Sequence, residues 1–383
     1  MSVTFAKGFV ASGVRAGLKS SGNLDLALVQ NLGPLNSAAS VFTSNRCQAN
    51  PVLWSKQVMA DGQVSAIILN SGGANCYTGP EGFQTTHATA ESVANHLGIS
   101  AGDVLVCSTG LIGQQLDLTK VLVGVEAAVT ALNHDGGAHA SEAIMTTDSR
   151  PKQAHRSLNG WSIGGMAKGA GMLAPGLATM LVVITTDAAL DSSSLDTALR
   201  QATRVTFDRL DSDGCMSTND TVSLLASGAS GISPELEQFT LELTGVCRDL
   251  ALQLLSDAEG SAHDIAIEVV NAASEDDAVE VGKSVARNNL FKAAIYGNDP
   301  NWGRILAAVG VTKAAFDPYD IDVSINGVSV SRKGQPDQSR DLINLTPRDV
   351  HILISLNAGS HSATVWTNDL THEYVEENSA YSS

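Results

Sequence analysis

Charged and aromatic side chains are scarce in this sequence. Of its 383 residues, 16% are charged and 4% are aromatic, whereas 43% are hydrophobic and 35 are glycine. Such a composition is typical of a folded protein and excludes a disordered chain. One uncharged stretch, residues 169–186, reaches the length of about 18 residues at which a membrane span becomes possible. It contains three glycines and a proline, so we interpret it as a buried loop followed by a strand.

Cysteine is also scarce, and the number and spacing of the cysteines do not indicate disulfide bonds or a zinc site. The five cysteines are odd in number, widely spaced and never in a C-x-x-C pair, which argues against a disulfide framework and a cysteine zinc site. Residues 1–22 carry three basic side chains with no apolar run between them, unlike a signal peptide. The nine histidines include no H-E-x-x-H pattern. We therefore expect a cytoplasmic protein with no bound metal.

Positive charge is in deficit. The chain has 23 basic and 40 acidic residues, a formal net charge of -17. Nucleic acids and anionic membranes need a cationic face to displace counterions, so neither is expected as the main partner. The deficit is uneven, because residues 1–178 hold 10 basic and 10 acidic side chains and residues 179–383 hold the remaining 13 and 30.

Short apolar runs alternate with helical patterns, which predicts a mixed α/β architecture. At about 100–200 residues per domain, the length suggests two domains or one large one. Strands are expected at 24–30, 64–70, 104–108, 180–186, 221–227, 265–270, 350–356 and 363–367, with a hairpin of 321–325 and 328–331 around Asn326-Gly327. Helices are expected at 83–97, 193–207, 234–258 and 277–287. Turn residues and the charge step place the domain boundary at 175–179.

Several short segments match known functional motifs but lack the neighbouring elements or residues that those motifs require. Gly98 to Gly102 spells G-x-S-x-G, but a helix precedes it and a strand follows, the reverse of a nucleophile elbow. Gly169 to Ala174 fits a loose dinucleotide fingerprint, yet a proline follows where the helix should run. Gly282-Lys283-Ser284 lacks the first P-loop glycine and has acidic neighbours, and Asp211 to Gly214 has an arginine at the first calcium-ligand position.

The segment KGAGMLAPGLAT, residues 168–179, carries the most chemical information. A loop of glycine and proline runs into Ala178 and then into Thr179, which opens an apolar strand. If the bond between them were cut, Thr179 would present its hydroxyl beside a free α-amine, whose usual pKa of about 7.7–8.0 suits a general base. The plain structural alternative is a buried strand that begins with a threonine, and spacing alone does not exclude it.

Residues 168–179 closely resemble the signature of the ornithine acetyltransferase family, the glutamate N-acetyltransferases of arginine biosynthesis. The resemblance extends over nearly the whole chain, because further blocks follow in family order. These are KGF at 7–9, CSTGLIG at 107–113, AIMTTD at 143–148, STNDT at 217–221, DAEG at 257–260, DPNWGR at 299–304 and NSAY at 378–381. So many ordered blocks are not expected by chance.

The resemblance implies a fold of two α/β lobes with an active site of the N-terminal-nucleophile type. It also implies that the chain cleaves itself between Ala178 and Thr179 into an α chain (1–178) and a β chain (179–383), which assemble as an α2β2 heterotetramer. Thr179 would take the acetyl group of N2-acetylornithine as an ester, and glutamate would then collect it. No cofactor is implied.

An oxyanion forms when a nucleophile attacks the acetyl carbonyl, and it needs preorganised donors. Thr109 and Gly110 match the family's oxyanion-hole pair. The sequence supports this assignment independently, because the two residues follow an expected strand and glycine allows a close backbone approach. A turn that merely ends the strand is the plain alternative.

The resemblance also assigns substrate contacts. Lys168 could pair with a substrate carboxylate, and Glu259 could neutralise the side-chain amine of ornithine. The full set of matching positions is Thr146, Lys168, Thr179, Glu259, Asn378 and Ser383. Thr147 stands beside Thr146, and the sequence does not decide between the two hydroxyls.

Two positions depart from the family pattern. Ser383 replaces the usual final threonine, which keeps the hydroxyl and removes a methyl group. Gly73 replaces a common asparagine, and the sequence gives this change no role. We interpret the aromatic turn at 299–304 as scaffold near the site rather than as catalytic.

Three other functions fit parts of the sequence. A bifunctional enzyme would also load Thr179 from acetyl-CoA, as a co-substrate. An aminopeptidase or amidohydrolase would use the same Thr179 but let water resolve the ester. An acidic binding module would have no nucleophile, and it predicts a chain that stays intact.

Overall fold

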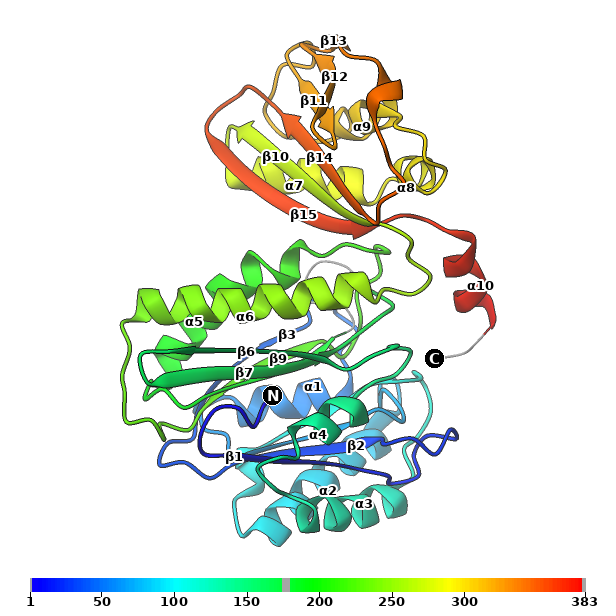
Figure 1. Cartoon of the computed structure of the whole chain (residues 1–383). Helices are drawn as coiled ribbons and strands as arrows, with labels where there is room; N and C mark the ends of the chain where they lie inside the picture. The colour runs from blue at the N-terminus through cyan, green and yellow to red at the C-terminus, as the bar shows by residue number, and fades with distance from the viewer. Residues whose placement is uncertain (1, 174–179, 381–383) are drawn as a thin grey trace.

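The computed structural model describes residues 2–173 and 180–380. Its strands form three sheets, stacked from bottom to top in Figure 1 with helices between and around them. The expected mixed α/β class is confirmed. Within the described ranges, no helix is both long and apolar enough to cross a membrane.

The lowest sheet has four strands in the order β1-β2-β4-β5. Helices α2 (Gly79–Leu97) and α3 (Leu118–Thr130) cover its outer face, where Leu28 and Ile68 pack against Val93 and Val125. The strands are β1 (Phe9–Val14), β2 (Leu26–Asn31), β4 (Ala66–Asn70) and β5 (Val104–Ser108), and the 3-10 turn η1 (Ala101–Asp103) precedes β5.

The middle sheet has five strands in the order β3-β9-β8-β7-β6. Helices α5 (Ser192–Arg204) and α6 (Leu236–Ser256) cover one face. Helices α1 (Asn50–Val58) and α4 (Gly137–Ala143) lie between the other face and the lowest sheet. The strands are β3 (Ser37–Phe42), β6 (Lys152–Leu158), β7 (Trp161–Lys168), β8 (Leu181–Thr186) and β9 (Thr221–Ala226), with η2 (Phe207–Arg209) after α5.

The third sheet builds a separate upper lobe with its own core. Its strand order is β13-β12-β11-β14-β10-β15. The strands are β10 (Asp264–Ala272), β11 (Asp322–Ile325), β12 (Val328–Arg332), β13 (Gln335–Pro336), β14 (Asp349–Ser355) and β15 (His361–Asn368). The helices are α7 (Glu275–Ala286), α8 (Asn289–Tyr296) and α9 (Trp302–Val309), with η3 (Arg340–Leu342) before β14.

Helix α10 (His372–Ala380) leaves the upper lobe after β15 and runs down the side of the molecule toward the middle sheet (Figure 1). Gly260, which follows α6, lies against the first turn of α10. A Cβ on Gly260 would lie 2.2 Å from the Tyr374 nitrogen, so only glycine allows this approach. Thr371 fixes the helix start, because its hydroxyl donates to the Gly260 carbonyl at 2.6 Å and accepts the Tyr374 N–H at 2.8 Å.

The hairpin expected around Asn326-Gly327 is confirmed. Both residues have positive φ, 48° and 83°, as a type I′ turn requires, and they join β11 to β12. The domain boundary expected at 175–179 lies outside the described residues. The lobes meet between α6 and β10, and the strands on either side of 175–179, β7 and β8, are antiparallel neighbours in one sheet.

Candidate active site

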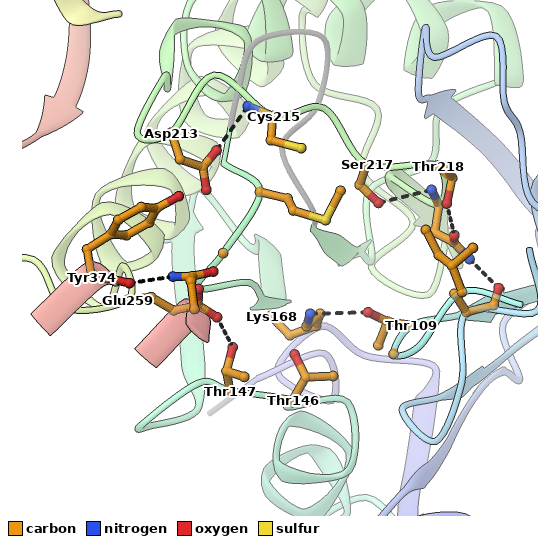
Figure 2. A pocket seen from close by; sticks show the side chains of 17 residues that line it. Thr109, Thr146, Thr147, Lys168, Asp213, Cys215, Ser217, Thr218, Glu259 and Tyr374 are labelled. Atoms are coloured by element: carbon orange, nitrogen blue, oxygen red, sulfur yellow. Dashed lines mark hydrogen bonds between the residues drawn. The ribbon is translucent and has the colours of Figure 1, made fainter. Parts of the chain in front are cut away.

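An open cavity lies at the end of the middle sheet where β7 ends and β8 and β9 begin. Six of the residues that the sequence singled out line it together: Thr109, Gly110, Thr146, Lys168, Glu259 and Asn378. They come from five segments that are far apart in the chain, and Figure 2 shows the side chains of Thr109, Thr146, Lys168 and Glu259 around the same cavity. The remaining three, Ala178, Thr179 and Ser383, lie outside the described residues.

Thr109 and Gly110 form one wall of the cavity, directly after β5. The Thr109 backbone is held on both sides, because its N–H donates to the Asn70 carbonyl at 3.0 Å and its carbonyl accepts the Gly73 N–H at 3.0 Å. Gly110 has φ +126°, and a Cβ there would lie 2.8 Å from the Gly73 nitrogen, so the position requires glycine. No described residue accepts the Gly110 N–H. This geometry suits an oxyanion donor.

Lys168 ends β7 with its side chain buried, at 1% exposure. Its Nζ donates to the Thr109 hydroxyl at 3.2 Å (Figure 2). No described carboxylate forms an ion pair with it. Burial lowers the Lys168 pKa, and nearby Asp148 opposes that effect. A buried ammonium with one neutral partner is costly unless an anion joins it, so the site suits a ligand carboxylate.

Asp148 lies behind this wall and connects two of the lining segments. One carboxylate oxygen accepts the Gly169 N–H at 2.7 Å, and the other accepts the Thr146 N–H at 2.9 Å. Burial alone would raise the Asp148 pKa, but the ammonium groups of Lys168 and Lys152 outweigh burial and lower it. The residue is therefore a buried carboxylate beside the cavity.

Glu259 is one of two acidic residues, with Asp213, that line the cavity. It follows the end of α6, its backbone N–H donates to the Ala170 carbonyl at 3.0 Å, and a Cβ on Gly171 would lie 2.5 Å from its carboxylate. Thr147 donates its hydroxyl to the Glu259 Oε1 at 2.7 Å. The Thr146 hydroxyl bonds to no described residue, which favours Thr146 over Thr147 as the one that meets a ligand.

Helix α10 brings Asn378 and Tyr374 to the opposite side of the cavity. The Asn378 amide donates to the Tyr374 carbonyl at 3.0 Å, within the helix. Burial and the charge of Asp213 raise the Tyr374 pKa to about 12. The phenol is therefore neutral and able to donate a hydrogen bond.

Other residues that line the cavity were not predicted as site residues from the sequence, although three of them, Ser217, Thr218 and Asn219, belong to the block at 217–221. The Asn219 amide donates to the carbonyls of Ala74, at 2.6 Å, and Ser108, at 2.8 Å, which ties β9 to the end of β5. The other missed residues that line the cavity include Met172, Asp213, Cys215, Ser217, Thr218 and Tyr374. The described residues contain no group of three His, Cys, Asp or Glu side chains able to hold a metal ion.

Asp220, the residue before β9, lies next to the strand that Thr179 precedes. Its side chain is fully buried, and its Oδ1 accepts the Met180 N–H at 3.2 Å. Burial raises the Asp220 pKa well above its usual range, and the bond from Met180 opposes this only in part. Met180 directly follows Thr179 in the chain, so this buried carboxyl fixes the start of β8.

A cavity lined by hydroxyl and amide groups and by charged side chains of both signs, Lys168 and Glu259, suits an enzyme better than a simple binding module. The model of the ArgJ family matches residues 10–383. The chain therefore belongs to the ArgJ family, and the resemblance read from the sequence blocks is confirmed.

Curated relatives match the chain over its whole length. The arginine biosynthesis bifunctional proteins ArgJ of Streptomyces avermitilis and Thermobifida fusca are 62% and 60% identical, covering 100% of this chain and 100% of theirs. A solved ornithine acetyltransferase from Mycobacterium tuberculosis, complexed with ornithine, is 52% identical, with TM-score 0.45, over 47% of this chain and 96% of its own. A Bacillus halodurans ArgJ structure is 34% identical, with TM-score 0.49, over 51% and 97%.

Proposed function

We propose that the chain transfers the acetyl group of N2-acetyl-L-ornithine to L-glutamate through an acetyl ester on Thr179, as a step of arginine biosynthesis. The observation that carries the proposal is the convergence of six positions on one cavity, with Gly110 and Thr109 facing the buried Lys168. Family membership over residues 10–383 supports the same activity.

The chemistry begins at Thr179, whose free α-amine takes the proton of its own hydroxyl. The hydroxyl oxygen attacks the acetyl carbonyl, and the developing oxyanion accepts hydrogen bonds from the Gly110 N–H and the Thr109 hydroxyl. As the carbon–nitrogen bond breaks, the proton passes to the nitrogen of the departing ornithine. Glutamate then attacks the ester through its amine and regenerates the threonine, so the reaction requires no cofactor.

The site must bind first a substrate with a cationic side chain, acetylornithine, and then one with an anionic side chain, glutamate. Lys168 binds the α-carboxylate that both substrates share, since it is buried without an ion pair to any described residue. Glu259 faces the ornithine ammonium. Thr146, Asn378 and Ser383 complete the polar contacts.

Self-cleavage between Ala178 and Thr179 fits the place of this bond in the chain, between the neighbouring strands β7 and β8. β7 and β8 pair over six residues, from Ile163 with Thr186 to Lys168 with Leu181. Main-chain hydrogen bonds would hold the α chain (1–178) and the β chain (179–383) together after the cut. We further propose that the two chains assemble as α2β2 in the cytoplasm.

A bifunctional activity is the second candidate. Relatives 60–62% identical over the whole chain are named bifunctional, which favours acetyl-CoA as a second acetyl donor. In both activities the same ester on Thr179 would form.

Incubation of the purified protein with acetylornithine and glutamate tests the proposal. We expect ornithine and N-acetylglutamate to appear in equal amounts. Free acetate at a comparable rate would favour an amidohydrolase instead, and no reaction would contradict the proposal. Acetyl-CoA with glutamate, assayed separately, distinguishes the bifunctional form.

Lys168→Ala should impair substrate binding. A charge-assisted hydrogen bond contributes about 1.5–3 kcal/mol, so kcat/KM should fall about tenfold to a hundredfold, mainly through KM. In the wild type, Lys168 binds a carboxylate only when protonated, and burial lowers its pKa. KM should therefore rise as the pH increases through that lowered pKa. Unchanged kcat/KM in Lys168→Ala would remove this residue from the site.

A further inference from the structure

A buried lysine that does not line the cavity lies directly behind it. Lys152 is the first residue of β6, and its side chain is fully buried. Its ammonium pairs with the Asp148 Oδ1 at 2.5 Å and with the Asp257 Oδ2 at 2.5 Å. Among the described residues, no other cation forms an ion pair with either carboxylate. Lys152 therefore joins two acids from different parts of the chain.

The first of these acids holds two substrate-binding segments. Through its two oxygens, Asp148 accepts the N–H of Gly169, which follows Lys168, and the N–H of Thr146. A shift of this carboxylate would move the main chain at both places. The Lys152–Asp148 pair thus fixes the distance between Lys168 and Thr146.

The second acid holds the third segment. Asp257 follows the last turn of α6 and stands two residues before Glu259. Its Oδ2 also accepts the Ser149 N–H at 3.0 Å, and its other oxygen accepts the Ser149 hydroxyl. The Lys152–Asp257 pair therefore fixes the end of α6, and with it Glu259, to the segment that carries Thr146.

Stability alone does not account for this arrangement. Buried ion pairs lose so much hydration that apolar replacements of similar volume are often equally stable. What an apolar cluster lacks is a defined direction and distance for each contact, which charge-assisted hydrogen bonds impose. A site that must hold a carboxylate and an ammonium at set positions needs that definition.

We propose that Lys152 is a positioning residue for substrate binding, which joins Asp148 to Asp257 and so holds the segments that carry Thr146, Lys168 and Glu259 in register. The role rests on the proposed function, because those three residues are its substrate contacts. It needs no contact between Lys152 and the substrate.

Lys152→Met tests the role, because methionine has a similar length and no charge. We expect KM for acetylornithine and for glutamate to rise about tenfold or more, while kcat changes by less than about threefold. Arg209→Met is the matched control: Arg209 is 5% exposed and pairs with Glu275 at 2.6 Å, and neither residue lines the cavity. It should lower the melting temperature and leave both KM values unchanged.

A Lys152→Met protein that melts earlier but keeps both wild-type KM values would overturn the inference, because a purely structural ion pair behaves in that way. If this variant does not fold, Asp257→Asn removes one charge and keeps the shape. It should raise KM for acetylornithine more than for glutamate, since Glu259 faces the ammonium, and equal or absent effects would also overturn the role. A wild type that releases no ornithine contradicts the proposed function instead.

Discussion

Thr179→Ala should give a single uncut chain with no acetyl-transfer activity. The hydroxyl of Thr179 would serve both as the nucleophile of self-cleavage and as the acetyl carrier, so its removal stops both reactions. We expect a loss in kcat of at least about 10⁴-fold, as for other nucleophiles. Intact-mass measurement should find one species for the variant and two, residues 1–178 and 179–383, for the wild type.

Thr179→Ser is the matched control, because serine keeps the hydroxyl and loses only a methyl group. It should still be cut and should retain part of the transfer activity. A melting curve like that of the wild type would show that Thr179→Ala is folded. Two pieces from the alanine variant, or an active wild type that is never cut, would contradict the assignment of the nucleophile.

Gly110→Ala should lower kcat by about 10²–10³-fold, the usual cost of losing one oxyanion donor. Gly110 has φ +126°, and a Cβ there would lie 2.8 Å from the Gly73 nitrogen, which belongs to the main chain. The backbone must shift to relieve this contact, and the Gly110 N–H would move with it. KM should change little, because Lys168 and Glu259 are not displaced. Steady-state kinetics on the cleaved protein measures both values.

Gly113→Ala separates this effect from backbone strain. Gly113 lies three residues further along the same loop and also has positive φ, 83°, but a Cβ there meets nothing within 4 Å. Both variants strain the backbone, because positive φ is unfavourable for alanine, whereas only Gly110→Ala displaces a donor. Equal kcat values for the two variants would exclude Gly110 from the oxyanion hole.

Apolar β-branched runs were enough to predict most strands. β5 (VLVCS), β8 (LVVITT) and β14 (DVHILIS) are rich in valine, isoleucine and leucine, and each was predicted to within two residues. β7 (WSIGGMAK) was missed although every residue in it is buried. Its two glycines have low strand propensity, and pairing with β6 and β8 supplies what the local sequence does not.

β3 and α10 were also missed, because the local sequence of each gives little indication of its structure. β3 (SAASVF) has little local preference and is held by pairing with β9. Helix α10 has no buried residue along its length and forms where the chain returns from the upper lobe. Both depend on contacts with distant parts of the chain, which a single sequence does not reveal.

The site was only partly predictable. Family blocks identified residues 109–110, 146, 168, 259 and 378, and all of them line one cavity. The blocks did not explain how these segments are held together. Asn219 bonds to Ala74, 145 positions away, and Lys152 pairs with Asp257, 105 positions away. Such contacts depend on how the sheets stack, so the roles of Asn219 and Lys152 can be identified only from the structure.

The proposed reaction depends on an acetyl ester on Thr179, which a mass measurement can detect. Wild-type protein is incubated with acetylornithine in the absence of glutamate, and the two chains are weighed intact. We expect the 179–383 chain to gain the mass of one acetyl group and to lose it again when glutamate is added. Release of ornithine without any acetyl group on that chain would contradict it.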